Sequence, residues 1–350
     1  MGKACVVIDE FGRLPSGMAV EAVTLDSGEG LVVTVLTLGA TLQGIQLACG
    51  THVLLGLPRL DDYLDQQVYL GVTVGRYANG IAGGRFELDG VVHSLPVNDG
   101  ANTLHGGETG FDRALWRIEQ AGLADDGGAE LVLSHVSEDG DQGFPGDLAT
   151  IVRFHVTGQR LSMRYLATTT ASTPISLTSH GYFNLAGEGT GDILDHELSI
   201  RAGHFLPVDA GAIPDGAPVP VTGTPFDFRT PRRIGDRIDQ DHQQLDFGSG
   251  YDHCYVLDRD VDGLLLAAEL ADPHSGRRMR VLTTEPGLQF YSGNHLGPSP
   301  AGGGYPSRSG LCLETQAFPD SPNRADFPSV VLSPGEVWES ETVREFEAGA

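Results

Sequence analysis

The chain has 350 residues, of which 40% are hydrophobic and 20% charged, so it can bury a large core and is not a disordered, collagen-like or fibrous protein. Its 47 acidic and 22 basic residues give a formal charge of -25, which disfavours nucleic acid and anionic membranes as partners and suits a neutral ligand. The cysteines, Cys5, Cys49, Cys254 and Cys312, are too few and too far apart for a disulfide framework or a C-x-x-C pair, which predicts a reducing, cytoplasmic setting.

The N-terminal segment meets acidic residues before it reaches signal-peptide length, and no later stretch is long enough to span a bilayer. A β-branched run at 31–38 predicts a strand, and alternating patterns predict further strands at 161–168 and 278–284. Short helices are expected at 61–68 and 232–244, but no sustained helical stripe occurs. Because no linker tract interrupts the chain, we predict a single domain over residues 1–350, an all-β fold with a large antiparallel β-sandwich and few short helices.

Three residues in apolar or Gly-rich, strand-like settings are candidates for proton-transfer chemistry: His105, His180 and Glu314. Alternation places His180 on a polar strand face and Glu314 on the face opposite its two leucine neighbours. A carboxylate in an apolar strand needs a partner or a ligand, since burying it unpaired is costly. If the three side chains meet in one pocket, they could perform acid and base steps without a cofactor.

Other interpretations of these residues stay open from the residues alone. A single histidine more often has a structural hydrogen-bonding role, and a buried glutamate is as readily part of an ion pair. The trio could ligate a metal, although it lacks a close-spaced ligand pair, and Glu314 with Asp252 could form a glycosidase carboxylate pair. Walker A and zincin chemistry are excluded, because Lys3 is the only lysine and the pair His196-Glu197 has no second histidine at the required spacing.

Seven short segments, in order along the chain, resemble the motifs of the aldose 1-epimerases, also called galactose mutarotases. The resemblance extends from residue 71 to about residue 335, and the motifs are specific as an ordered set rather than singly. They are Gly75-Arg76-Tyr77-Ala78-Asn79, Asn102-Thr103-Leu104-His105-Gly106-Gly107 with Gly110-Phe111-Asp112, Gly143-Phe144-Pro145-Gly146, Leu177-Thr178-Ser179-His180-Gly181-Tyr182-Phe183-Asn184-Leu185, Gly250-Tyr251-Asp252-His253, Gln289-Phe290-Tyr291-Ser292-Gly293-Asn294 and Glu314-Thr315-Gln316-Ala317-Phe318-Pro319-Asp320.

This resemblance implies a β-sandwich whose concave face binds a free sugar and interconverts its anomers with no metal or redox cofactor. It implies that His180 is the general acid and Glu314 the general base, which requires Glu314 ionised and His180 protonated together. The residues implied to hold the sugar are Asn79, His105, Asp252 and Gln289. A monosaccharide is the expected partner, and the chain is expected to be a monomer or homodimer.

One position departs from the family pattern: Gly80 stands where the family usually carries a second arginine that contacts sugar hydroxyls. Arg76 or Arg85 would have to replace that contact. Two alternatives therefore remain, a sugar-binding module without turnover and an epimerase of a phosphorylated hexose. The second would need a cationic phosphate clamp, for which Arg229, Arg232 and Arg233 are candidates.

Overall fold

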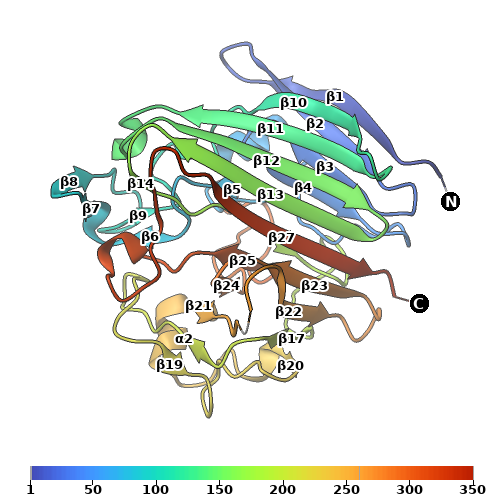
Figure 1. Cartoon of the computed structure of the whole chain (residues 1–350). Coiled ribbons are helices and arrows are strands. Elements are labelled where there is room, and N and C mark those ends of the chain that lie inside the picture. The colour runs from blue at the N-terminus through green and yellow to red at the C-terminus, as the bar shows by residue number, and fades with distance from the viewer. Residues whose placement is uncertain (1, 260, 350) are drawn as a thin grey trace.

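The computed structural model describes residues 2–259 and 261–349, and strands dominate its architecture (Figure 1). The predicted all-β fold with antiparallel sheets is confirmed. Helical structure in these residues is limited to short pieces. They are α1 (Leu60–Asp65), α2 (Gln243–Gly248) and the 3-10 turns η1 (Ala82–Gly84), η2 (Asp141–Gly143), η3 (Ile234–Asp236) and η4 (Ser321–Asn323). None of these helices is long and apolar enough to cross a membrane.

A nine-stranded sheet forms one layer. In spatial order its strands are β10 (Arg117–Leu123), β11 (Ala129–Ser137), β12 (Leu148–Thr157), β13 (Arg160–Thr169), β27 (Trp338–Glu347), β23 (Arg278–Thr283), β22 (Leu265–Ala271), β17 (Glu197–Ile200) and β20 (Arg232–Arg233). In β12 every second side chain is buried, including Val152 and Phe154, while Arg153 between them is exposed. This two-residue period gives the sheet one apolar face for the core and one face for solvent.

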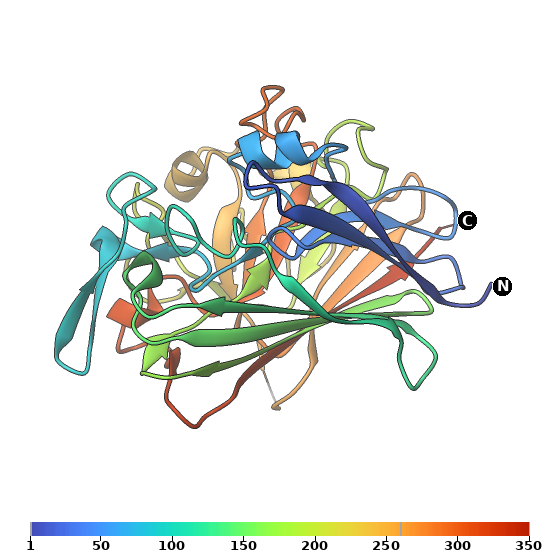
Figure 2. The ribbon, with the colours of Figure 1, turned by 90° about the horizontal axis from the view of Figure 1, so that it is seen from above.

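Two smaller sheets supply the opposing strands. The four-stranded sheet contains β1 (Cys5–Arg13), β2 (Ala19–Asp26), β3 (Val32–Leu36) and β4 (Thr41–Gln46), and the six-stranded sheet contains, in spatial order, β16 (Tyr182–Phe183), β25 (Leu311–Gln316), β24 (Gly287–Tyr291), β21 (Asp252–Val256), β18 (His204–Phe205) and β19 (Val219–Pro220). From above, the green strands of the nine-stranded sheet lie along the lower side of the molecule and the dark blue N-terminal strands lie above them (Figure 2).

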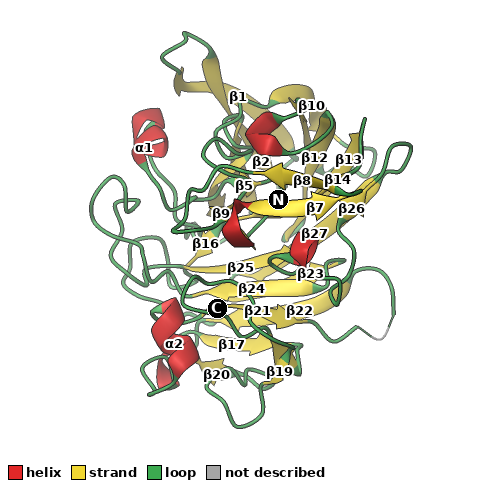
Figure 3. Ribbon diagram, turned by 90° about the vertical axis from the view of Figure 1, so that its left-hand side faces the viewer, coloured by secondary structure: helices red, strands yellow, loops and turns green. Residues whose placement is uncertain are grey.

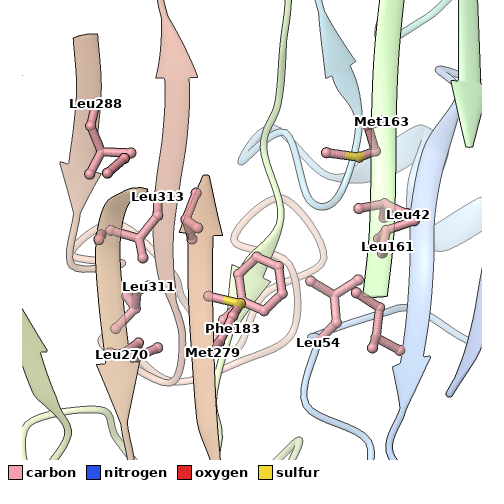
Figure 4. Packing of buried hydrophobic residues seen from close by; sticks show 14 of the residues in the cluster. Leu42, Leu54, Leu161, Met163, Phe183, Leu270, Met279, Leu288, Leu311 and Leu313 are labelled. Carbon is pink, nitrogen blue, oxygen red and sulfur yellow. The ribbon is translucent and has the colours of Figure 1, made fainter. Parts of the chain in front are cut away.

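The hydrophobic core collects side chains from all three sheets (Figure 4). Leu288, Leu311 and Leu313 come from the six-stranded sheet, and each has no exposed surface. Burying a leucine contributes roughly 1.5–3 kcal/mol, and slipping a strand by one residue would exchange its buried and outward faces. The leucines therefore fix the register that turns their sequence neighbours, among them Gln289 and Glu314, to the other face of the sheet.

Four two-stranded pairs connect the loops around this outer face. They are β5 (Thr73–Val74) with β15 (Thr178–Ser179), β6 (Gly80–Ile81) with β9 (Thr103–Leu104), β7 (Arg85–Leu88) with β8 (Val91–Ser94), and β14 (Thr173–Pro174) with β26 (Val331–Leu332). The pairs β5–β15 and β14–β26 join segments from distant parts of the sequence by backbone hydrogen bonds, so these loops are held at fixed positions relative to one another, whereas β7 and β8 form a local hairpin.

The predicted strands at 31–38, 161–168 and 278–284 are confirmed as β3, β13 and β23. The helix α1 lies within one residue of the predicted start, and its two acidic residues in the first turn, Asp61 and Asp62, are favourable to the helix dipole. The helix expected at 232–244 is wrong. Residues 232–233 form β20, and α2 begins only at Gln243, where the ring of His242 accepts a hydrogen bond from the backbone N–H of Gln244. Both α-helices appear at the left of Figure 3.

Candidate active site

The outward face of the six-stranded sheet forms the floor of a cavity of about 550 Å³, a size typical of small-molecule sites. Glu314 on β25 lies directly across from Gln289 on β24, whose side chain hydrogen-bonds Asp252 on the next strand, β21. All six residues predicted for the site line this cavity: Asn79, His105, His180, Asp252, Gln289 and Glu314. The alternation of β25 thus places Glu314 as the sequence predicted, away from Leu311 and Leu313.

His105 and Asn79 reach the cavity through the pairing of β6 with β9. The Nδ1 atom of His105 accepts a hydrogen bond of 3.1 Å from the backbone N–H of Asn79. Burial, and secondarily His180, lower the pKa of His105 well below its usual value, so the ring is neutral. We assign its proton to Nε2 from this hydrogen bond. His105 therefore offers the cavity a hydrogen-bond donor.

Backbone conformation explains the glycine residues beside His105. Both Asn79 and His105 have left-handed backbone angles, with φ values of 70° and 52°, and such angles in residues other than glycine concentrate at functional sites. A Cβ atom on Gly106 would lie 2.0 Å from the carbonyl oxygen of Gly75, so this position requires glycine. The side-chain oxygen of Asn79 accepts the N–H of Gly80 at 2.8 Å, which leaves the Asn79 amide hydrogens for a ligand.

His180 and Glu314 face each other at the base of the cavity. The Nε2 atom of His180 lies 3.7 Å from Oε1 of Glu314, and the two residues are only 5% and 2% exposed. Oε2 of Glu314 has no hydrogen-bond partner in the described residues. An unpartnered buried carboxylate oxygen is costly, and it marks a position where a ligand hydroxyl would be stabilised.

Burial shifts the pKa values of Glu314 and His180 in opposite directions. It raises the pKa of Glu314 well above its usual value, an effect that Asp252 reinforces and Arg344 opposes, and it lowers the pKa of His180 to about 4. Near neutral pH the pair therefore shares one proton. These shifts favour neutral His180 with protonated Glu314, which differs from the expected ion pair, because burying two charges is unfavourable.

Asp252 and Gln289 form a second polar pair in the cavity. The amide nitrogen of Gln289 donates to Oδ1 of Asp252 at 2.7 Å. Burial raises the pKa of Asp252 to about 6, although the bond from Gln289 opposes this rise. The side-chain oxygen of Gln289 has no partner in the described residues. The pair therefore presents acceptor oxygens at which sugar hydroxyls can donate.

The described part of the cavity wall contains no arginine and no lysine. Arg76 does not replace the family arginine missing at Gly80, because its buried guanidinium donates to Ser137 and to the carbonyl oxygens of residues 137, 138 and 145. Arg85 is also absent from the wall. A Cβ atom on Gly80 would lie 2.8 Å from Cδ1 of Ile213, so a loop of this chain borders that position.

The candidate phosphate clamp lies outside the cavity. Arg229 pairs with Asp227 and Arg233 pairs with Asp195, and neither these arginines nor Arg232 are among the residues that line the cavity. Asp99 and Asp209, which are exposed acids among the lining residues, would repel a phosphate. The geometry therefore disfavours a phosphorylated hexose as the ligand.

Several cavity residues were not predicted from the sequence. Tyr69, Tyr182 and Tyr291 surround His180, with ring centroids 5.9, 5.1 and 6.3 Å from the imidazole, and the loops at 99–102 and 209–212 border the entrance. Tyr182 and Tyr291 belong to two of the motifs that resemble the family, so the sequence offered a signal for these two cavity residues. Asp99 pairs with Asn102 in a tight turn and also lines the cavity.

The comparisons with known proteins agree with the motifs. The sequence profile of the aldose 1-epimerase family matches residues 21–345. The chain is 41% identical to galactose mutarotase of Bos taurus over 342 residues, 95% of this chain and 96% of the bovine protein, and 40% identical to aldose 1-epimerase of Escherichia coli (strain K12) over 343 residues, 95% and 97% of the two chains. The crystal structure of galactose 1-epimerase from Lactobacillus acidophilus NCFM matches with a TM-score of 0.88 at 30% identity and covers 99% of both chains. The chain therefore belongs to the aldose 1-epimerase family.

Proposed function

We propose that this protein interconverts the α and β anomers of free aldoses such as glucose and galactose, with Glu314 as general base and His180 as general acid. The observation that carries the proposal is the separation of 3.7 Å between Nε2 of His180 and Oε1 of Glu314, inside a cavity lined by hydrogen-bonding groups and by no arginine or lysine in the described residues. The names of the relatives, galactose mutarotase and aldose 1-epimerase, support the same reaction.

The reaction moves one proton in each direction and needs no net uptake. Glu314 in its ionised form accepts the proton of the anomeric hydroxyl, protonated His180 gives a proton to the ring oxygen, and the C1–O5 bond breaks as C1=O1 forms. Rotation about C1–C2 presents the other face of the aldehyde. Glu314 then returns its proton to O1, His180 takes the proton of the O5 hydroxyl, and the ring closes as the other anomer.

The protonation state that burial favours corresponds to one stage of this cycle. Once the ring has opened, Glu314 is protonated and His180 is neutral, and burial favours this same distribution of the shared proton. The cavity thus stabilises the pair in the state that accompanies the open-chain sugar. Each positioned proton-transfer group can contribute on the order of 10²- to 10⁴-fold, so the pair can make a slow spontaneous ring opening fast.

Four residues are proposed to hold the sugar. His105 donates from Nε2 and Asn79 from its amide, while Gln289 and Asp252 supply acceptor oxygens. Because no arginine lines the described cavity wall, the contact usually made by the family arginine is missing. Loss of one charge-assisted hydrogen bond typically costs about 1.5–3 kcal/mol, so we expect weaker sugar binding than in relatives that carry it.

Polarimetry of freshly dissolved α-D-glucose and α-D-galactose tests the proposal directly. We expect the protein to accelerate the approach to anomeric equilibrium for both sugars, and to act poorly on glucose 6-phosphate because acidic residues border the cavity. Sugar binding without any acceleration would instead identify a non-catalytic binding module. Faster turnover of the phosphorylated sugar than of glucose would reverse the assignment of substrate class.

The pH dependence of the reaction should separate binding from catalysis. Asp252 has a pKa of about 6, so it loses its charge as the pH falls through that value, and KM should rise there because a charged acceptor is lost. The pKa of His180 is about 4, and below it the pair carries two protons and contains no base, so kcat should fall only there. Polarimetric measurements of KM and kcat from pH 3.5 to 8, on the wild type and on Asp252→Asn, test both expected changes. A rise of KM below pH 6 that persists in the Asp252→Asn variant would contradict the assignment to Asp252.

The site residues do not fit a metal centre, although His105, His180 and Glu314 offer atoms within 4.8 Å of one another. A histidine ligand needs a free lone pair, whereas Nδ1 of His105 is occupied by the N–H of Asn79 and Nε2 carries the proton. We therefore expect extensive treatment with EDTA, followed by desalting, to leave the polarimetric rate unchanged. A loss of activity that Zn²⁺ or Mg²⁺ restores would show that the trio acts through a metal.

We further propose that the reaction takes place in a reducing compartment such as the cytosol. All four cysteines, Cys5, Cys49, Cys254 and Cys312, are free thiols in the described residues, and Cys5 and Cys49 are exposed. Exposed free thiols are typical of proteins kept in reducing surroundings.

A further inference from the structure

Cys312 lies next to the proposed catalytic pair but does not line the cavity. It shares its face of β25 with Glu314, two residues further along the strand, and it has no exposed surface. Its neighbours on the adjacent strands are Tyr182 and Tyr291. Burial raises the pKa of its thiol well above the usual value, so the sulfur stays protonated at any physiological pH.

The sulfur of Cys312 contacts the imidazole nitrogen that points away from Glu314. Sγ of Cys312 lies 3.5 Å from Nδ1 of His180, while Nε2 of the same ring faces Glu314. The hydroxyl of Tyr182 gives its hydrogen to the backbone carbonyl of Val68 at 2.8 Å. Nδ1 of His180 is therefore the side-chain partner of the sulfur among the hydrogen bonds of the described residues.

The proposed acid role of His180 fixes the direction of this contact. In the protonated ring both nitrogens carry hydrogen, so Nδ1 donates and Sγ of Cys312 can only accept. When Nε2 gives up its hydrogen, the hydrogen that remains on Nδ1 keeps the sulfur as its acceptor. Nε2 then keeps its lone pair towards Glu314, which burial keeps protonated.

We propose that Cys312 is a positioning residue that fixes the tautomer of His180, so that Nε2 is the nitrogen that exchanges a proton with the sugar. The inference rests on the proposed function. When His180 gives its Nε2 proton to the ring oxygen, the product must be the Nδ1–H tautomer, and the sulfur of Cys312 stabilises that tautomer as the acceptor at Nδ1. A neutral sulfur supplies this acceptor without adding a third charge beside Glu314 and Asp252.

The other groups around His180 do not replace this acceptor. Tyr69 and His105 from the loops, Tyr182 from β16, Tyr291 from β24 and Glu314 from β25 all pack against or face the ring. Burial raises the pKa of Tyr69 to about 12 and those of Tyr182 and Tyr291 further, so these phenols remain neutral. The residue's own backbone carbonyl also favours the protonated ring, so we expect Cys312 to share the task of orienting it.

Substitution of Cys312 provides the test. Cys312→Ala removes the acceptor, and we expect kcat to fall about tenfold with little change in KM, because the residue does not touch the cavity. Cys312→Ser keeps an atom that can accept from Nδ1, so it should restore most of the rate. In parallel, ¹⁵N NMR of histidine-labelled protein at neutral pH reports the tautomer, with the His180 signals assigned by difference from His180→Asn. We expect wild type to show a protonated Nδ1 and an unprotonated Nε2, and Cys312→Ala to show a mixture.

Each outcome decides the proposal. Wild-type kcat in Cys312→Ala, or a lower kcat with an unchanged tautomer, would overturn it. If Cys312→Ala does not fold, Cys312→Val takes its place: valine fills the space of the thiol without an acceptor, so the His180 signals should show a mixture of tautomers, and unchanged signals would overturn the inference. The NMR measurement needs no sugar, so an inactive wild type would refute the proposed function while the role of Cys312 is still tested.

Discussion

Replacing Glu314 by glutamine is expected to lower kcat for anomer interconversion by about 10²- to 10⁴-fold while sugar affinity changes little. Glutamine keeps the size and the hydrogen-bonding oxygen of the side chain but cannot take the proton of the anomeric hydroxyl. It also cannot share a proton with His180, whose Nε2 lies 3.7 Å from Oε1 of Glu314. Polarimetric kcat and an independent affinity from ligand-observed NMR would measure the two effects.

Glu285→Gln is the matched control for this substitution. Glu285 is also buried, and burial raises its pKa to about 7, but it is not among the residues that line the cavity. The same change of a buried carboxyl group should therefore leave kcat near the wild-type value. If Glu314→Gln retained near-normal rates, or if the control lost activity as severely, Glu314 would not be the base.

Replacing His180 by asparagine is expected to give the second large effect, a decrease in kcat of about 10²-fold or more. Asparagine can still donate a hydrogen bond to the ring oxygen but cannot transfer a proton to it. A water molecule that enters the space left by the ring could supply part of the acid step, so this loss should not exceed that of Glu314→Gln. The same polarimetric assay, with KM determined in parallel, measures the loss.

His196→Asn separates the role of His180 from the general cost of removing a buried histidine. Burial lowers the pKa of His196 to about 4, as it does for His180, and its Nε2 accepts the backbone N–H of Leu185 at 2.9 Å, away from the cavity. This variant should have a lower melting temperature but a normal kcat per folded molecule. Equal kcat losses in both variants would mean that His180 acts only through stability.

Strand alternation made part of the site predictable. In β25 the apolar residues Leu311 and Leu313 had to share the core face, so Glu314 had to face outward, and the structure confirms this orientation. The prediction succeeded because the two-residue period of a strand is a local property of the backbone. The helix expected at 232–244 failed because its first residues pair with β17, a contact that no local pattern reveals.

The sequence by itself determined the all-β class, the strands of the core and, through the ordered motifs, membership of the aldose 1-epimerase family. Only the tertiary structure decided that His180 and Glu314 lie within 3.7 Å and share one proton, that Nδ1 of His105 is occupied by Asn79, and that Arg76 points away from the cavity. The physical reason is that periodicity encodes which face of an element is buried, whereas distances, desolvation and hydrogen-bond direction depend on segments brought together from distant parts of the chain.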